Sequence, residues 1–158
     1  MNIHRLVIIV AATLSIAASG VTFALVGGAA AKVPFFAIMT GGNEVSSTGQ
    51  ANAGDPNGTG SATVYIFPAA GKLCFTLSVF GLDTPTAAHI HNQRAGKNGD
   101  IVVNLTQVPP SGDPGAWGNC AAGLDPALLS AIRANPGAYY VNVHTASFPD
   151  GAVRGQLF

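Results

Sequence analysis

Three histidines have the spacing expected of a metal site built on β-strands. His89 and His91 are two residues apart in the segment AHIHNQ, and a strand directs the side chains of residues i and i+2 to the same face. In the segment YYVNVHT, His144 shares a face with Tyr140 and Asn142. If the two strands are neighbours in a sheet, the three imidazoles could converge on one ion. Three neutral imidazole nitrogens with an open coordination position suit copper or zinc.

The same histidines also fit a purely structural interpretation. An imidazole on a strand can donate to a neighbouring carbonyl or carboxylate while its ring packs, and Thr145 and Asp150 are candidate partners near His144. The residues alone therefore leave two alternatives open, a metal site and a hydrogen-bonded cluster of histidines.

The segment FPDGAVRGQL adds an arginine to the same region. Its turn signal PDG predicts a hairpin, in which His144 and Arg154 lie opposite each other or one pair apart. An arginine within a strand usually pairs with a carboxylate, and Glu44 in the segment TGGNEV is a candidate. We expect a structural ion pair between Glu44 and Arg154 that holds the N-terminal segment to the last strand, in preference to an anion-binding site.

Seven segments have the pattern of strands. Short apolar or alternating runs recur between turn signals, which indicates an antiparallel sandwich or barrel. The predicted strands are residues 35–41, 60–67, 72–82, 86–92, 100–106, 138–145 and 151–158. Residues 46–60 and 108–119 are rich in Gly, Pro, Ser and Asn, and we expect them to form surface loops.

One helix interrupts the predicted strands. In LDPALLSAIRANPG, Asp125 is a favourable N-cap and Pro126 suits the first helical position. Leu128, Leu129 and Ile132 form one apolar face. The NPG sequence that follows ends the helix.

The N-terminus has the features of an export signal. After Arg5 the chain carries no charged residue from Leu6 to Ala31, and this stretch ends in small residues. We expect residues 1–31 to be a signal peptide cleaved after Ala31, with an uncleaved membrane anchor as the alternative. Residues 32–158 then form a single domain that is secreted, periplasmic or held at the cell surface.

The two cysteines are interpreted in the light of this compartment. Oxidising conditions outside the cytoplasm favour a disulfide between Cys74 and Cys120, with two buried free thiols as the alternative. Closing the chain between these positions would stabilise the fold by about 4 kcal/mol in the chain-entropy model.

Charge and motifs exclude several functions. The chain has 7 Lys and Arg against 7 Asp and Glu, so it lacks the basic excess that phosphate contacts require, and nucleic acid is not an expected partner. A membrane is expected as a partner only through an uncleaved leader. The sequence contains no nucleophile elbow and no phosphate loop. A hydrolase that uses His144 with an aspartate is kept only as a remaining alternative.

Long segments of the chain resemble a known family. AAHIHNQRAGKNGDIVVNL, YYVNVHTASFPDGAVRGQL and TGGNEV resemble the CHRD (chordin-type) domain of exported bacterial proteins, over about residues 36–158. The resemblance implies an all-β, immunoglobulin-like sandwich. Together with the strand and helix patterns, it predicts an antiparallel immunoglobulin-like or Greek-key β-sandwich of about seven strands with one short helix. It also favours a non-enzymatic binding or structural module that acts on an unknown extracellular ligand or protein.

A more distant similarity supports the metal alternative. Copper/zinc superoxide dismutase, also an antiparallel Greek-key structure, uses a His-x-His strand in its copper site, and the correspondence reaches His89, His91 and His144. It stops there because His4 lies in the leader and no fourth histidine remains to bridge two metals. We therefore do not expect dismutase activity. A copper- or zinc-binding protein, with redox activity as a further option, remains the second hypothesis.

Overall fold

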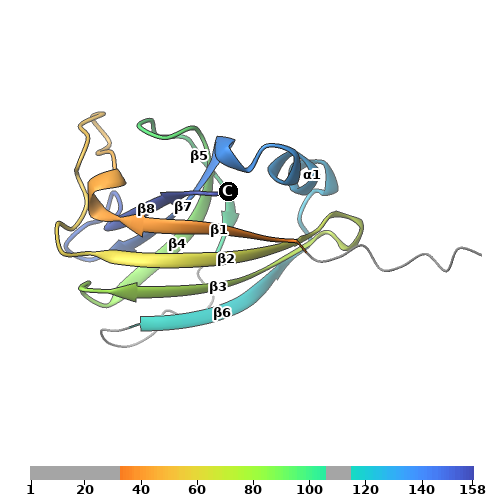
Figure 1. Cartoon of the computed structure of the whole chain (residues 1–158), viewed down its shortest axis with the longest axis horizontal. Coiled ribbons are helices and arrows are strands. Elements are labelled where there is room, and N and C mark those ends of the chain that lie inside the picture. The colour runs from red at the N-terminus through yellow and green to blue at the C-terminus, as the bar shows by residue number, and fades with distance from the viewer. Residues whose placement is uncertain (1–32, 106–114) are drawn as a thin grey trace, which may run out of the picture. The chain divides into compact units, whose positions relative to one another are not determined.

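The strands of this protein form one antiparallel sheet, and alternating apolar and polar side chains give most of them an inward and an outward face. The computed structural model describes residues 33–105 and 115–158 (Figure 1). The strands of this part are β1 (Pro34–Thr40), β2 (Thr59–Phe67), β3 (Lys72–Phe80), β4 (Pro85–Asn92), β5 (Asp100–Asn104), β6 (Gly115–Ala122), β7 (Tyr139–Thr145) and β8 (Val153–Gln156). The predicted leader, residues 1–31, lies outside the described residues.

The sheet folds over on itself to make two layers. The strand order is β5-β4-β7-β8-β1-β2-β3-β6, and every pairing is antiparallel. Figure 1 shows β1, β2, β3 and β6 in front of β4, β7 and β8. The layers are joined at β1 and β8, where Thr40 pairs with Arg154 and where Phe36 and Phe158 exchange two backbone hydrogen bonds. The predicted all-β fold with one helix is confirmed.

An apolar core fills the space between the layers. In β2 and β3 every second residue faces inward, from Ala62 to Ile66 and from Leu73 to Val79, and these side chains are buried. In the other layer Ile90 of β4 and Val141 and Val143 of β7 are fully buried in the same cluster. The period of two in the sequence therefore identified the inward faces correctly.

The helix α1 (Pro126–Ala134) forms as predicted. The Asp125 side chain accepts a hydrogen bond of 2.8 Å from the backbone N–H of Ala127, and the helix ends at Asn135, whose N–H donates to the Ala131 carbonyl. Leu129 and Ile132 are completely buried in the core. The helix packs against β2 and the 3-10 turn η2 (Pro68–Ala70), and the 3-10 turn η3 (Pro136–Ala138) leads from it into β7. No helix in residues 33–105 and 115–158 is long and apolar enough to cross a membrane.

Strand β6 corrects the predicted loop at 108–119. Residues 115–119 belong to this strand, which pairs with β3 from Gly115 opposite Val79 to Ala122 opposite Lys72. The described part of the chain therefore contains eight strands, where about seven were expected. Residues 106–114 of the predicted loop and of the predicted strand 100–106 lie outside the described residues.

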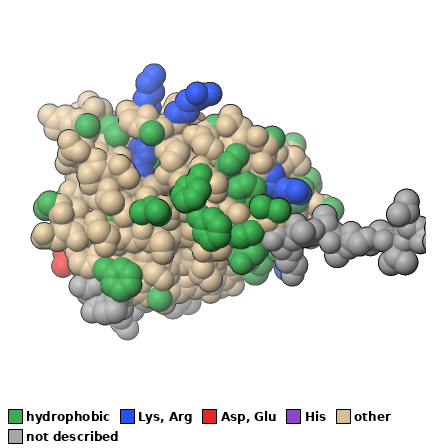
Figure 2. Space-filling model, viewed as in Figure 1, with side chains coloured by type: hydrophobic (Ala, Val, Ile, Leu, Met, Phe, Trp, Pro, Cys, Tyr) green, Lys and Arg blue, Asp and Glu red, His purple; other side chains and the backbone are tan. Residues whose placement is uncertain are grey.

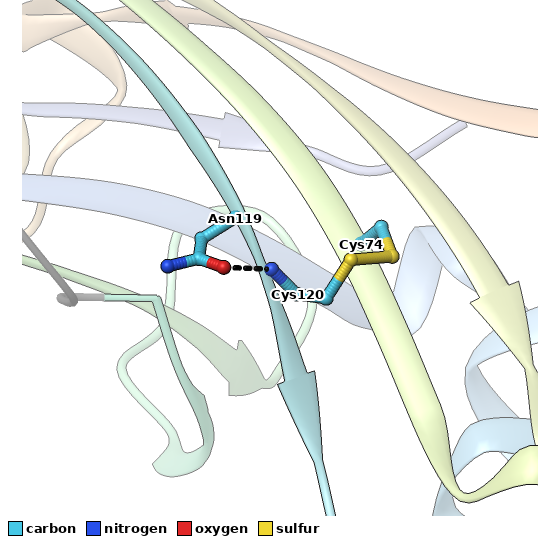
Figure 3. Close-up of a disulfide and its surroundings, with 3 residues drawn as sticks. All are labelled: Cys74, Asn119 and Cys120. Carbon is cyan, nitrogen blue, oxygen red and sulfur yellow. Dashed lines mark hydrogen bonds between the residues drawn. A yellow bond between two sulfur atoms is a disulfide. The ribbon is translucent and has the colours of Figure 1, made fainter.

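A disulfide fastens β6 to β3. Cys74 and Cys120 are directly opposite each other in this pair, with their Cα atoms 3.9 Å apart, and they form the predicted bond (Figure 3). Asn119 supports the same segment, because its side-chain oxygen accepts a hydrogen bond of 2.7 Å from the Cys120 N–H. The predicted disulfide is therefore confirmed. Among the strands that the structure describes, β6 lies at one end of the order, with a covalent bond to its neighbour β3.

A second buried region lies on the other side of β7. Tyr140, Asn142 and Arg154 point away from the apolar core, yet each has at most 2% of its surface exposed. Residues 41–55 and 93–99 cover them, with cross-links such as the hydrogen bonds from Asn98 Nδ2 to the carbonyls of Val45 and Ser46. The polar faces of β7 and β8 are thus largely covered by loops, while His144 and Gln156 remain partly exposed. We call this region the polar core.

Candidate metal centre

The three histidines meet because β4 and β7 are adjacent antiparallel strands. In their register Ala87 lies opposite His144 and His89 lies opposite Asn142, so all three imidazoles project from one face. His89 Nδ1 lies 3.1 Å from His144 Nε2. One ring nitrogen from each of His89, His91 and His144 lies within 4.8 Å of the others. We call these three residues the imidazole cluster.

The His144 ring is held in one tautomer. Its Nδ1–H donates a hydrogen bond of 2.9 Å to the Pro149 carbonyl, which lies in the turn between β7 and β8. In a neutral ring Nε2 then carries a lone pair, and this lone pair faces His89. Metal-binding histidines usually donate their other ring N–H to a carbonyl or carboxylate in this way. Asp150, a partner considered from the sequence, instead accepts from the Ser47 N–H at 2.9 Å.

The His91 ring has a protein partner at each nitrogen. Nδ1 donates to the Gly99 carbonyl at 2.9 Å, and Nε2 lies 3.0 Å from the side-chain oxygen position of Asn142. A neutral ring that donates from Nδ1 can only accept at Nε2, so the Asn142 amide must turn its NH₂ group toward it. An ion would have to displace Asn142 to reach His91. His89 and His144 are therefore the better-prepared ligands.

Burial keeps the cluster uncharged. It lowers the pKa of His89 to about 4, and the neighbouring rings of His144 and His91 add to this effect. Burial also lowers the pKa of His91 and of His144, against the opposing effect of their hydrogen bonds to carbonyl oxygens. Near neutral pH the cluster presents neutral imidazoles, which is the form that binds a metal ion.

A stack of rings supports the cluster from the polar core. The His91 and Tyr140 rings are parallel within 2°, with centroids 4.7 Å apart. On the Tyr140 ring lies the Arg154 guanidinium, with its carbon 3.3 Å from the ring centroid, in a cation–π contact. Arg154 therefore supports the His91 ring through Tyr140. The sequence predicted the strands that carry Tyr140 and Arg154, but it did not predict this stack.

Glu44 and Arg154 come together in this polar core at a long distance. Arg154 Nη1 lies 3.9 Å from Glu44 Oε1, and both side chains are 1% exposed. The shorter bonds of Arg154 go elsewhere, to the carbonyls of Lys97 at 2.7 Å and Arg94 at 3.1 Å, and to Asn98 Oδ1 at 3.3 Å. Arg154 therefore holds mainly the loop 93–99, which contains the Gly99 carbonyl that orients His91.

The buried carboxyl group of Glu44 has a hydrogen-bond partner at only one of its two oxygens within the described residues. One oxygen accepts from the Val45 N–H at 3.0 Å, whereas buried Oε2 has no hydrogen-bond partner in the described part of the chain. Burial raises the pKa of Glu44, although the hydrogen bond from the Val45 N–H and the charge of Arg154 lower it in part. The protonated acid is thus favoured more than in water.

A cavity lies beside His91, one of the three residues of the imidazole cluster. It has a volume of 180 Å³ and lies beside His91 and Asn142. Its other lining residues are Ser47, Asn98, Gly99, Tyr140 and Asp150. Of these, sequence reasoning had noted only Tyr140 and Asp150. The NG turn signal at Asn98 and Gly99 indicates a turn, but only the folded chain shows that this turn reaches His91.

Comparison with known proteins agrees with the resemblance found in the sequence. The family described as CHRD domain matches residues 35–157, a segment that includes the imidazole cluster and the polar core. No curated protein and no solved structure matches the chain. The distant similarity to superoxide dismutase stays a prediction. Since the family match spans well over half of the sequence, the chain belongs to the CHRD domain family.

Proposed function

We propose that this CHRD domain is an exported, non-enzymatic binding module and that its imidazole cluster binds one copper or zinc ion. The observation that carries the proposal is the pair His89 Nδ1 and His144 Nε2, which lie 3.1 Å apart. Two nitrogens at ~2.0–2.1 Å from one tetrahedral ion are about 3.3 Å from each other, so this spacing is close to that of two ligands of the same metal.

The ligand set follows from the hydrogen bonds. His144 offers Nε2 without losing its bond to the Pro149 carbonyl, and His89 offers Nδ1 once its proton moves to Nε2. His91 joins as a third ligand through Nε2 if Asn142 turns away, while Nδ1 keeps Gly99. The usual order of affinities favours copper over zinc at such an imidazole site.

Export is supported by the disulfide. Disulfides persist in oxidising compartments and are rare in the cytosol, and the Cys74–Cys120 bond fits a domain that works outside the cytoplasm. The leader predicted for residues 1–31 is consistent with this location. Membership of the CHRD family supports a binding module in preference to an enzyme.

Calorimetric titration with Cu²⁺ and Zn²⁺ tests the proposal. The wild-type protein should bind one equivalent, and the double variant His89→Ala/His144→Ala should bind more than about tenfold more weakly. Asn92→Ala, an exposed change on the same strand, is the matched control and should bind like the wild type. His91→Ala should weaken binding less than the double variant does, because His91 must first exchange a protein partner.

Two results would contradict metal binding. One is a wild-type protein that takes up neither ion, and the other is equal uptake by the wild type and the double variant. In the first case the 3.1 Å contact is a simple hydrogen bond from His89 to His144, and the domain binds through another surface.

A further inference from the structure

A second cavity lies where the loops 41–55 and 93–99 meet β8. It has a volume of 350 Å³ and shares no lining residue with the cavity beside His91. Of its lining residues, Glu44 and Arg154 are buried in the polar core, whereas Ala95 and Gly96 are exposed. The cavity therefore extends from the polar core to the surface. We call it the loop cavity.

The loop cavity has the size and the mixed lining of a ligand site. Ligand pockets generally measure roughly 300–1,000 Å³ and combine apolar walls with a few polar groups. Val45, Ala51 and Ala95 supply short aliphatic side chains, and Asn43 and Gln156 supply side-chain amides. Since the volume lies near the lower limit of this range, a ligand of one small ring fits better than an extended chain.

The two amides of the loop cavity have used their donors and kept their acceptors. Asn43 Nδ2 donates to the Arg154 carbonyl at 3.3 Å. Gln156 Nε2 donates to the carbonyls of Gln93 at 2.6 Å and Gly137 at 3.1 Å. Because a backbone carbonyl can only accept, these bonds fix the orientation of both amides. The amide oxygens of Asn43 and Gln156 are therefore left without a partner in the described part of the chain.

The charged groups of the loop cavity show the same imbalance. Glu44 Oε2 has no hydrogen-bond partner in residues 33–105 and 115–158. The terminal nitrogens of the Arg154 guanidinium already donate to Asn98 Oδ1 and to the carbonyls of Arg94 and Lys97. The side chains that line the cavity thus offer unused acceptors and few free donors. A matching ligand must bring hydrogen-bond donors.

Charge decides between two kinds of donor, ammonium groups and hydroxyl groups. A cation in the loop cavity would meet the buried guanidinium of Arg154 and the two basic residues of the loop, Arg94 and Lys97, against the one carboxyl group of Glu44. Figure 2 shows Lys and Arg side chains protruding at the upper edge of the molecule, where Figure 1 places the loop between β4 and β5. A neutral ligand with several hydroxyl groups avoids this repulsion and still supplies the donors.

We propose that the loop cavity binds one neutral saccharide unit. Its hydroxyls donate to the free oxygens of Asn43 and Gln156, and its C–H groups contact the short aliphatic side chains of Val45 and Ala51. The inference names a ligand for the binding module proposed above. It does not depend on the metal, because the loop cavity is separate from the cavity beside His91.

NMR titration of the isotope-labelled protein tests the saccharide site. The probes are D-glucose, D-galactose and N-acetyl-D-glucosamine, and a chelator keeps the imidazole cluster free of metal. At least one of these sugars should cause saturable shifts of the Asn43 and Gln156 side-chain amides and of the Ala95 and Gly96 backbone amides. The dissociation constant should be on the order of 1–10 mM, as expected for a ligand of about a dozen heavy atoms.

Three variants make the test specific. Ala95→Trp blocks the mouth of the loop cavity from an exposed position and should weaken binding more than about tenfold. Asn43→Ala removes one acceptor and should weaken binding about 3–10-fold, the usual effect of one hydrogen bond. Ala131→Trp, at an exposed position of α1, is the matched control and should bind like the wild type. The amide spectra of all three variants should keep the dispersion of the folded wild type.

Three results would overturn the saccharide site. The first is the absence of saturable shifts in the wild type up to about 100 mM of each sugar. The second is equal binding by the wild type and Ala95→Trp. The third is saturation by ethylammonium or by glucuronate without any by the neutral sugars, which would assign the cavity to a cation or an anion. Metal uptake is measured separately on the imidazole cluster, so each of these results leaves the proposed metal binding to its own test.

Discussion

His89 combines partial burial with two neighbouring imidazoles. Its ring is partly buried beside two other imidazoles, and its pKa of about 4 lies well below the ordinary histidine value of 6.5. A proton on this ring would be poorly solvated, and any proton on His144 or His91 would repel it. In the apo protein His89 therefore stays neutral under conditions in which an unfolded chain takes up a proton.

The free energy of unfolding should consequently decrease as the pH is lowered from about 6.5 to 4. Over this range the unfolded state binds more protons at position 89 than the folded state does, so the free energy of unfolding decreases as pH decreases. We expect a contribution on the order of 1 to 2 kcal/mol from His89 after solvent screening. Urea unfolding of the apo protein at several pH values measures it.

The control for this pH effect is His89→Gln, which removes the titrating group but keeps a polar side chain. Groups outside the imidazole cluster, including the carboxylates, contribute equally to both proteins, so the difference between the two pH profiles reports His89 and its coupling to His91 and His144. Parallel profiles for the wild type and His89→Gln would contradict the lowered pKa.

Gly151 makes room for the buried carboxyl group of Glu44. A Cβ atom at position 151 would collide with Glu44 Oε2, and the backbone there has a φ of +143°, which L-amino acids with a side chain rarely adopt. Gly151→Ala should therefore lower the free energy of unfolding by about 1–3 kcal/mol. Thermal or urea unfolding provides the measurement.

Gly137→Ala is the matched control for the collision at Gly151. A Cβ atom at position 137 would have open space around it, with no heavy atom of another segment within 4 Å. This change should therefore alter the free energy of unfolding by no more than about 0.5 kcal/mol. Shortening the acid with Glu44→Asp should restore part of the stability of Gly151→Ala. Equal effects of the two glycine substitutions would show that Glu44 is not the cause.

The sequence predicted the residues of the imidazole cluster better than their partners. Alternation along a strand suffices to put His89 and His91 on one face, and a turn signal suffices to fold Arg154 back beside His144. The Gly99 and Pro149 carbonyls could not be foreseen, because backbone groups carry no residue-type signal and their positions depend on loop conformation.

At the scale of elements, β6 shows why one strand was missed. Its sequence GAWGNCAA contains two glycines and an asparagine and no β-branched residue, so its local preference favours a loop. The strand forms because β3 offers a complete row of backbone partners and because Cys120 is bonded to Cys74. Tertiary context thus overrides local propensity at the edge of the sheet, whereas strands with clear alternation, such as β2 and β3, were predicted to within about two residues.

Removing the disulfide should release β6 first. In Cys74→Ser/Cys120→Ser the chain-entropy contribution of about 4 kcal/mol is lost, and the strand retains only pairing of weak intrinsic preference. Urea unfolding should show most of that loss. Hydrogen exchange should accelerate in β6 before it changes in β2, which is paired on both sides.

Reduction of the wild-type protein serves as the control for the cysteine substitutions, because it breaks the same bond without changing a side chain elsewhere. The reduced protein should match the double variant in both measurements. A loss of less than about 1 kcal/mol with unchanged exchange in β6 would mean that pairing with β3 alone holds this strand.

At the scale of the whole molecule, β7 separates two cores of different chemistry. Val141 and Val143 face the apolar core, whereas Tyr140 and Asn142 face the polar core under the loops 41–55 and 93–99. Alternation in the sequence indicated both faces of β7 but assigned the polar one to a metal site or to hydrogen-bonded histidines. Loop coverage could not be predicted, since it depends on contacts between segments more than 50 residues apart, such as the bonds from Asn98 to residues 45 and 46.

Arg154 should be the residue on which the polar core depends most. Arg154→Met preserves the length of the side chain but removes its bonds to the loop carbonyls and to Asn98, its contact with Tyr140, and the cation beside Glu44. Removing one partner of a buried charged group typically costs about 3–5 kcal/mol, and we expect a loss in this range on urea unfolding. Arg133→Met, at an exposed position of α1, is the control and should change stability by less than about 0.5 kcal/mol.

The division into two cores also predicts where the loss at Arg154 appears. In Arg154→Met, hydrogen exchange should accelerate in residues 93–99 and the Tyr140 ring should become mobile, while amides of the β2–β3 hairpin keep their protection until the whole domain unfolds. His91 should lose its fixed orientation with the Gly99 carbonyl, so metal affinity should fall although no ligand has been changed. Uniform acceleration over both layers would contradict two separable cores, and it would show that the guanidinium stabilises the sandwich as a single cooperative unit.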